Sequence, residues 1–213
     1  MDAPADRATR RRLLEVATRQ FAASGFRRTT VRAICREAHA NVAAVNYHFH
    51  GKLGLYTVVL ETAVDVMRDV TEAAMRAGEG LAPEDQLRAY IRTFCARIIA
   101  SRDDSRLHDL MHREMAEPTA ALATLVDRGL RPRLTYLAGI IGTLLGRPAD
   151  DPDVLLCASS IHAQILMFRP NPIADAVRRR FRLPALTPDR VADHISRFSL
   201  AALAPFRRSQ LAG

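Results

Sequence analysis

The feature that most constrains the fold is a hydrophobic repeat of three to four residues along most of the chain. This spacing places apolar side chains on one face of an α-helix. No segment sustains the alternation with period two that a half-buried strand requires. The sequence therefore predicts an all-α fold. The longest stretch of the repeat is Leu53, Tyr56, Leu60, Ala63, Met67, Val70 and Ala74.

Glycine, proline and capping residues divide this repeat into separate helices. Ser24-Gly25 is expected to end the first helix, and Pro132 is expected to kink or split a later one. A short basic segment at 178–182 precedes the last helix. Helix starts are expected at Thr30, Pro83, Asp103-Asp104, Pro118, Pro152 and Thr187-Pro188.

Positive charge is concentrated at the N-terminal end of the chain. Residues 1–52 hold ten basic and four acidic residues, which is +6 of the chain's net +8. A local excess of this kind is typical of a module that binds a polyanion, although a solubilising surface is an equally simple explanation of charge alone. The excess ends where the long helix begins. We therefore expect a domain at 1–52 and a larger helical domain at 53–213.

Two short helices joined by His39, Ala40 and Asn41 have the spacing of a helix-turn-helix. At 100° per residue, the three apolar positions of the second helix fall within about 60° of one another and should face inward. The opposite side presents small and polar residues that suit close approach to a major groove. The inward positions are Val42, Val45 and Phe49, and the outward ones are Ala43, Ala44 and Tyr47, flanked by Asn46 and His48. An ordinary helical hairpin with a polar face is the alternative.

The stretch from Thr9 to Leu60 resembles the DNA-binding domain of the TetR family of bacterial regulators. The match rests on 29–34 (TTVRAI), 41–49 (NVAAVNYHF), Lys52 and Leu55-Tyr56. Two positions depart from the common pattern: His39 stands where the turn usually has glycine, and Asn46 replaces a frequent tyrosine. Histidine is among the residues that tolerate positive φ. The resemblance implies DNA contact from Thr30, Arg32, Asn41, Val42, Ala43, Ala44, Asn46, Tyr47, His48 and Lys52.

A second motif at 113–118 (REMAEP) is similar to the CecR-like subgroup of that family. The resemblance implies a dimeric, sequence-specific regulator, commonly a repressor released from a palindromic operator by a small effector. The apolar helices Val154–Phe168 and Val191–Ala202 are the expected homodimer contact, with ordinary intrachain core as the alternative. Candidate effector-binding residues, for each of which an ordinary core or surface position is the favoured alternative, are Phe94, Ile98, His108, Met111, His112, Glu114, His162 and Met167.

Other classes of protein fit the sequence less well. No phosphate loop, nucleophile elbow or His-Glu-x-x-His run indicates an enzyme, and no cofactor is implied. His108 and His112 share a helix face, but no third metal ligand is evident, so no metal site is expected. The three scattered cysteines and the absence of a long apolar segment favour a cytoplasmic protein without a membrane span. An architectural DNA-binding or interaction protein and an activator stay open as alternatives.

Overall fold

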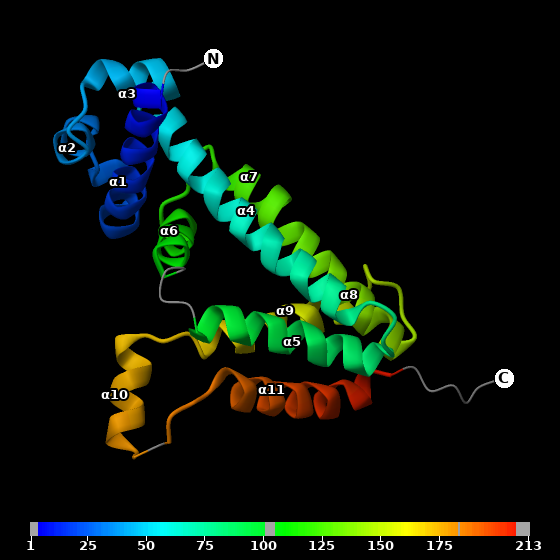
Figure 1. Ribbon diagram of the computed structural model, residues 1–213. Coiled ribbons are helices and arrows are strands. Elements are labelled where there is room, and N and C mark those ends of the chain that lie inside the picture. The colour runs from blue at the N-terminus through cyan, green and yellow to red at the C-terminus, as the bar shows by residue number, and fades with distance from the viewer. Residues whose placement is uncertain (1–3, 101–104, 183, 208–213) are drawn as a thin grey trace. The chain divides into compact units, whose positions relative to one another are not determined.

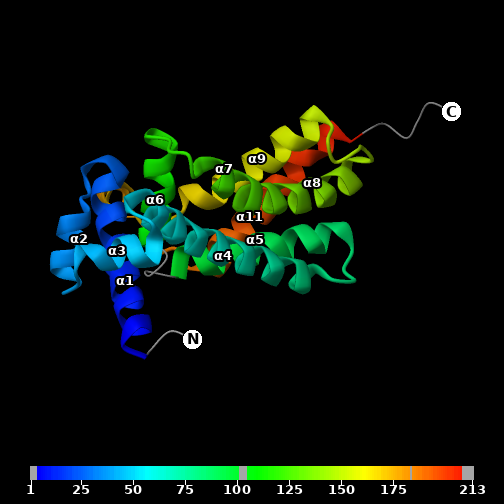
Figure 2. The same ribbon diagram turned by 90° about the horizontal axis from the view of Figure 1, so that it is seen from above.

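The computed structural model describes residues 4–100, 105–182 and 184–207. These residues form helices joined by short connections and contain no strand, which confirms the all-α prediction (Figure 1, Figure 2). They fall into two compact units: unit 1 comprises residues 1–67 and 103–129, and unit 2 comprises 68–102 and 130–213. No helix in the described part of the chain is both long enough and apolar enough to cross a membrane.

Unit 1 contains the predicted helix-turn-helix and further helices from the middle of the chain. Its elements are α1 (Pro4–Arg28), α2 (Val31–Glu37), α3 (Val42–Phe49), the first part of α4 (Lys52–Gly78), α6 (Ser105–Ala116), α7 (Leu122–Thr124) and a π-helical segment (Leu125–Leu130). The sequence places a domain boundary at residue 52, whereas the compact unit also includes the first part of α4 and helix α6, which packs against α1. The core shared by these helices includes Leu13, Phe21, Ile34, Val45, Phe49, Leu55, Tyr56 and Leu110.

The first helix is interrupted at Gly25, as the sequence predicts, and a further helical turn continues to Arg28. Gly25 has φ 75° and ψ 169°, a conformation that glycine adopts far more readily than other residues. The break leaves carbonyl groups of the preceding turn without helical partners. Arg113 of α6 supplies hydrogen-bond donors for these carbonyl groups. Its Nε donates to the carbonyl of Ala22 at 2.6 Å, and its Nη2 donates to the carbonyl of Ala23. The side chain of Arg113 thus caps the main part of α1.

Unit 2 is a bundle built around α5, α8, α9 and α11. Its elements are the remainder of α4, α5 (Pro83–Ala100), α8 (Arg131–Leu145), α9 (Pro152–Met167), α10 (Pro172–Arg180), α11 (Pro188–Leu203) and a 3₁₀ turn (Ala204–Phe206). Helix α5 packs against α8, α9 and α11. The core is mainly aliphatic, with Tyr90 and Phe94 as its large aromatic side chains.

Several predicted helix starts are confirmed. Thr30 and Thr187 cap α2 and α11 through their hydroxyl groups, and Pro152 occupies the first turn of α9. Pro132 lies in the first turn of α8, directly after the π-helical segment, so the expected split occurs there. Proline has no backbone N–H, and in the first turn of a helix that group would have no partner within the helix. The proposed cap at Asp103-Asp104 lies outside the described residues.

The expected helix start at Pro118 is wrong. Helix α7 begins at Leu122, because residues just after Pro118 are held in a turn instead. The Glu114 carboxylate accepts hydrogen bonds from the backbone nitrogen and the hydroxyl group of Thr119, at 2.7 and 2.8 Å. This tertiary contact competes with helix formation at 118–121.

Candidate DNA-binding interface

The turn between α2 and α3 is held by local hydrogen bonds. Helix α2 ends at Glu37 with Ala38 as its C-cap, and His39 follows in the left-handed region at φ 50°, which agrees with the expectation for this position. The backbone nitrogen of Ala40 donates to the carbonyl of Cys35 at 2.9 Å. Asn41 then caps α3, since its side-chain oxygen accepts from the nitrogen of Ala43 at 3.0 Å. The sequence of the turn therefore fixes where α3 begins.

One face of α3 is buried in unit 1. Val45 and Phe49 are fully covered, and both belong to the core that includes Ile34 and Leu13. The guanidinium group of Arg10 lies 5.3 Å from the ring centroid of Phe49 and covers its outer side. Burial of this face leaves the opposite face of α3 to solvent. The wheel prediction for Val45 and Phe49 is confirmed.

The exposed face of α3 carries the side chains that the sequence assigned to the groove. Tyr47 is 68% exposed, and Asn41, Ala43 and Asn46 are also exposed, while Ala44 is half-buried. Val42, which the wheel placed inward, is 40% exposed, so that part of the prediction is wrong. It occupies the first helical position after the cap, where no preceding turn of α3 covers it. Val42 is therefore available to a ligand, as the resemblance implied.

His48 is placed differently from the expectation of a phosphate contact. Its side chain is only 6% exposed, and its Nε2 lies 3.1 Å from a carboxylate oxygen of Asp6. The ring also packs edge-on against Tyr47, with centroids 4.9 Å apart. His48 joins α3 to the beginning of α1, which points to a role in positioning the exposed face.

A His48→Ala variant distinguishes positioning from phosphate contact. Operator affinity is expected to fall about tenfold, because the orientation of α3 and Tyr47 is no longer held. The dependence of log affinity on log salt concentration should keep its slope, since no phosphate contact is removed. Fluorescence anisotropy with labelled operator DNA at four salt concentrations measures both quantities. A slope smaller by about one would show that His48 contacts phosphate after all.

Lys52 begins α4, and Thr30 and Arg32 lie at the start of α2, so all three are near the ends of the helices that flank α3 in the chain. The Lys52 ammonium is 4.5 Å from the ring centroid of Phe26 and donates to the carbonyl of Arg27 at 3.4 Å. Partial burial lowers the pKa of Lys52 from its ordinary value. Thr30 and Arg32, at the start of α2, are exposed. These groups can meet a polyanion that approaches α3.

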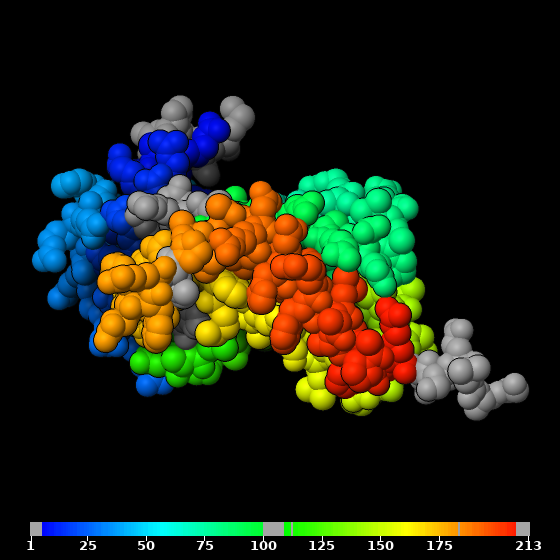
Figure 3. All heavy atoms as spheres, turned by 90° about the horizontal axis from the view of Figure 1, so that it is seen from below, coloured from blue at the N-terminus to red at the C-terminus, as the bar shows by residue number. Residues whose placement is uncertain are grey.

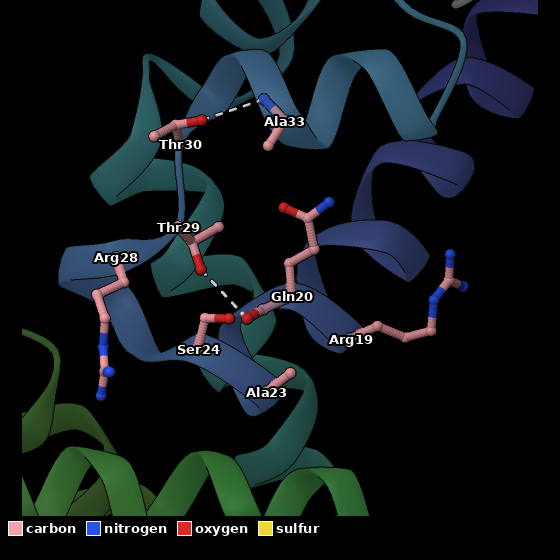
Figure 4. Close-up of a pocket in the computed structure, with 8 residues that line it drawn as sticks. All are labelled: Arg19, Gln20, Ala23, Ser24, Arg28, Thr29, Thr30 and Ala33. Carbon is pink, nitrogen blue, oxygen red and sulfur yellow. Dashed lines mark hydrogen bonds between the residues drawn. The ribbon is translucent and has the colours of Figure 1, made fainter.

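An open hollow of about 390 Å³ lies between α1 and α2 (Figure 4). Several of its polar groups are hydrogen-bonded within the protein. Arg19 and Gln20 donate to the two carboxylate oxygens of Glu37 at 2.7 and 2.6 Å, and these bonds lower the pKa of Glu37. The Thr29 hydroxyl lies within hydrogen-bond distance of the carbonyls of Gly25 and Gln20. The hydrogen bonds from Arg19 and Gln20 to Glu37 therefore hold α2 against α1.

The candidate effector residues do not form one cluster. Phe94, Ile98 and His162 lie in the core of unit 2, where the rings of Phe94 and His162 have centroids 5.7 Å apart. Met111 and Glu114 belong to unit 1, and Met167 is exposed at the end of α9. The side chains of His108 and His112 lie outside the described residues.

Two residues that the sequence reasoning did not select complete the cluster in unit 2. The Tyr90 hydroxyl is hydrogen-bonded to Nδ1 of His162 at 3.0 Å, and the buried guanidinium of Arg133 lies 4.6 Å from the Phe94 ring centroid. Burial lowers the pKa of Arg133 and raises that of Tyr90. A signal existed in the sequence, because Arg133 lies four and eight residues before Leu137 and Ile141 on the apolar stripe.

The buried inner face, exposed outer face and capped turn of α2 and α3 define a helix-turn-helix DNA-binding protein. Residues 13–59 match the family model of bacterial regulatory proteins of the tetR family. Residues 83–203 match the C-terminal domain of the HTH-type transcriptional dual regulator CecR. The chain therefore belongs to the TetR family of transcriptional regulators, in its CecR-like subgroup. This is a family of regulators rather than enzymes.

Individual relatives agree with this assignment. The chain is 27% identical to the HTH-type transcriptional dual regulator CecR of Shigella flexneri over an alignment of 168 residues, with coverage of 75% of each protein. A TetR-like regulator from Rhodococcus sp. RHA1 has the same fold, with a TM-score of 0.66, 19% identity and coverage of 92% and 96% of the two chains.

Two further solved structures share the fold and contain ligands. AibR in complex with isovaleryl coenzyme A and operator DNA gives a TM-score of 0.64, with 18% identity and coverage of 89% and 97%. The SmeT–triclosan complex gives a TM-score of 0.60, with 21% identity and coverage of 92% and 91% of the two chains.

Proposed function

We propose that this protein is a cytoplasmic, dimeric repressor that binds a palindromic operator and is released from it by a small-molecule effector. The observation that carries the DNA-binding part is the division of α3 into a face buried through Val45 and Phe49 and a face exposed through Asn46 and Tyr47. The relative from Shigella flexneri is named a dual regulator, so activation at some promoters is the second candidate.

The exposed residues have distinct roles in this proposal. The Asn46 amide can form two hydrogen bonds with an adenine edge, and the methyl groups of Ala43 and Ala44 fit thymine methyl groups. Val42 adds a further apolar contact, and Asn41 lies beside it at the start of α3. The Tyr47 hydroxyl, Thr30, Arg32 and Lys52 can bind phosphate oxygens and so fix the register of α3 in the groove.

Tyr47→Ala and Lys52→Ala test the interface. Each variant is expected to bind operator about tenfold more weakly and to retain wild-type helicity, because neither side chain belongs to the core. Gel shifts with operator DNA and far-ultraviolet circular dichroism measure the two properties. Arg190→Ala removes an equal charge from the start of α11 and serves as the control for Lys52→Ala. Wild-type affinity in both interface variants would contradict the assignment.

A sequence-independent architectural protein would use the same basic surface differently. It would bind unrelated DNA nearly as tightly as operator DNA, with a steep salt dependence. A sequence-specific regulator should prefer its operator by about a thousandfold or more. Competition between operator and unrelated DNA at one fixed salt concentration separates the two, and equal competition would favour the architectural function.

The dimer contact that we propose uses the outer faces of α9 and α11. Leu155, Leu156, Leu166 and Phe198 are exposed there. A groove of about 270 Å³ between the two helices is lined largely by apolar atoms, including those of Ile161 and Phe206. A two-fold axis would place each such face against its own copy and present two recognition helices to successive half-sites.

Analytical ultracentrifugation tests this contact. Leu156→Glu and Phe198→Glu place charges on the outer faces, so both variants should weaken the dimer at least tenfold. Leu53→Glu, at an exposed position in unit 1, is the control and should remain dimeric. Wild-type protein that sediments as a monomer at micromolar concentration would contradict the proposal.

Effector binding is proposed at the cluster of Tyr90, Phe94, Arg133 and His162. Support comes from the grouping of polar side chains within an otherwise apolar core, and from the ligands named for AibR and SmeT. An effector shifts the protein away from DNA only through a higher affinity for the state that does not bind operator.

A thermal-shift screen identifies compounds that stabilise the wild type. Tyr90→Phe, which removes only the hydroxyl group from the cluster, should reduce that stabilisation. Operator affinity should fall when a hit is added. A bound compound that leaves operator affinity unchanged would contradict the release mechanism.

A further inference from the structure

Helix α10 is well defined locally but has no core of its own. Asn171 caps it by accepting from the nitrogen of Ala174 at 2.8 Å, Pro172 occupies its first turn, and Asp175 pairs with Arg178 at 2.9 Å. None of its nine residues is buried. Helices of this length are marginal in water unless one face is packed against something. The sequence alone had indicated only a basic segment at this place.

The unpacked face of α10 is apolar. Ile173, Val177 and Phe181 follow one another at intervals of four, within about 80° on a helical wheel. Ile173 is 77% exposed and Phe181 is 70% exposed. Asp175 and Arg179 lie on the opposite side of the wheel. An amphipathic helix whose apolar side is exposed, as it is here among the residues that the structure describes, has the form of a docking element.

Exposed apolar side chains also occur on α9 and α11. Met167 ends α9 and is exposed, and Leu155, Leu156 and Phe198 are exposed on α9 and α11. Figure 3 shows atoms of α9, α10 and α11 together on one face of unit 2. Both α10 and the proposed dimer contact therefore carry exposed apolar side chains.

Charge also favours one partner for α10. Residues 172–182 contain four arginines and one aspartate, a net charge of +3. Residues 147–153, which lead into α9, contain three aspartates and one arginine, a net charge of −2. Arg147 pairs with Asp151 and Asp153, and Asp150 is exposed. The chain therefore carries an acidic segment that complements its own basic helix.

These two regions lie at opposite ends of α9. Helix α10 follows the C-terminal end of α9 (Figure 1). The acidic segment and Leu156 lie at the N-terminal end, and residues 156–164 of α9 contribute to the groove with α11. A two-fold axis perpendicular to α9 would make the two copies of this helix antiparallel. Each α10 would then lie beside the groove and the acidic segment of the other copy.

We propose that residues 172–182 form an arm that packs its apolar side into the α9–α11 groove of a second copy of this chain. The proposal rests on the proposed homodimer and adds a contact to it. Burial of Ile173 and Phe181 removes apolar surface from water in both copies, and the arginines of the arm approach the aspartates at 150–153.

Disulfide trapping tests the arm directly, because the groove already contains a native thiol. Cys157 lines the groove, while Cys35 and Cys95 are buried. Ile173→Cys or Phe181→Cys, oxidised with copper phenanthroline, should produce a covalent dimer on non-reducing gels. The product should disappear when Cys157→Ser is added. Arg179→Cys, on the polar side of α10, is the matched control and should give little product.

Ultracentrifugation of Ile173→Ser and Phe181→Ser supplies a second measurement. Each variant should raise the dimer dissociation constant about tenfold or more. If the variants keep the wild-type dimer dissociation constant and no disulfide-trapped product forms, the proposed arm contact is wrong, while the proposed homodimer still stands. A monomeric wild type would overturn both. Phe181-dependent binding to phosphatidylglycerol vesicles, without any effect on the dimer, would assign α10 to a lipid surface and also overturn the arm.

Discussion

Gly54→Ala is expected to remove operator binding almost completely. Gly54 lies in the first turn of α4, and a Cβ atom at this position would be 1.8 Å from the carbonyl oxygen of Phe49. That oxygen belongs to the backbone at the end of α3, so no side chain can rotate away to make room. Helix α3 must move away from α4, and the exposed face that carries Asn46 and Tyr47 moves with it.

Both stability and DNA binding should report this displacement. The free energy of unfolding should fall by about 3 kcal/mol, in the upper range for an overpacked contact. Operator affinity should fall about a hundredfold or more, since small misplacement of a recognition helix disturbs several base contacts together. Denaturant titrations and anisotropy with operator DNA measure these changes.

Gly139→Ala is the matched control for this substitution. Gly139 lies within α8, and an added Cβ there would have no heavy atom within 4 Å. Alanine favours helix over glycine by about 0.5–1 kcal/mol, so this variant should be slightly more stable than the wild type. Gly54→Ala protein with wild-type stability and operator affinity would show that there is room for a methyl group between Gly54 and the carbonyl oxygen of Phe49.

Glu114→Ala is expected to give the second large effect, through a buried hydrogen-bonded group in unit 1. The Glu114 side chain is fully buried. One carboxylate oxygen accepts from the Tyr56 hydroxyl at 2.6 Å, and the other accepts from the backbone and hydroxyl groups of Thr119. Burial raises the pKa of Tyr56, and its bond to Glu114 raises it further. The Tyr56 hydroxyl therefore stays protonated as the donor.

Removal of this acceptor leaves buried donors unsatisfied. Glu114→Ala should lower the free energy of unfolding by about 3 kcal/mol, since an unpaired buried donor costs about 1–3 kcal/mol and a cavity adds to the loss. Glu114→Gln keeps one carbonyl acceptor and should cost about 1 kcal/mol. Glu117→Gln, at an exposed neighbouring position, should change stability little. A small loss in Glu114→Ala, similar to that of Glu117→Gln, would contradict this role.

These contacts give the motif at 113–118 a physical meaning. Arg113 caps α1 before the break at Gly25, and Glu114 links α6 to Tyr56 of α4 and to Thr119. The side chains of both residues are directed into unit 1, which also contains the recognition helix. The second sequence motif is thus a structural part of the unit that contains the helix-turn-helix, although residues 50–112 separate the two in the chain.

The sequence determined features that depend on neighbouring residues. Periodic apolar positions specified helices, and Thr30, His39 and Asn41 specified the caps and the turn between α2 and α3, because caps and turns are made within a few residues. The inward orientation of Val45 and Phe49 followed from the same periodicity. The outward placement of Ala43, Asn46 and Tyr47 followed with it.

The tertiary structure decided what depends on residues far apart in the chain. Only packing showed that α6 joins unit 1, that His48 meets Asp6, and that Thr119 turns toward Glu114 instead of beginning a helix at Pro118. It likewise grouped Phe94 with Tyr90 and Arg133, and left α10 without a buried residue. Local patterns cannot specify these outcomes, since each depends on which surfaces meet when the helices pack.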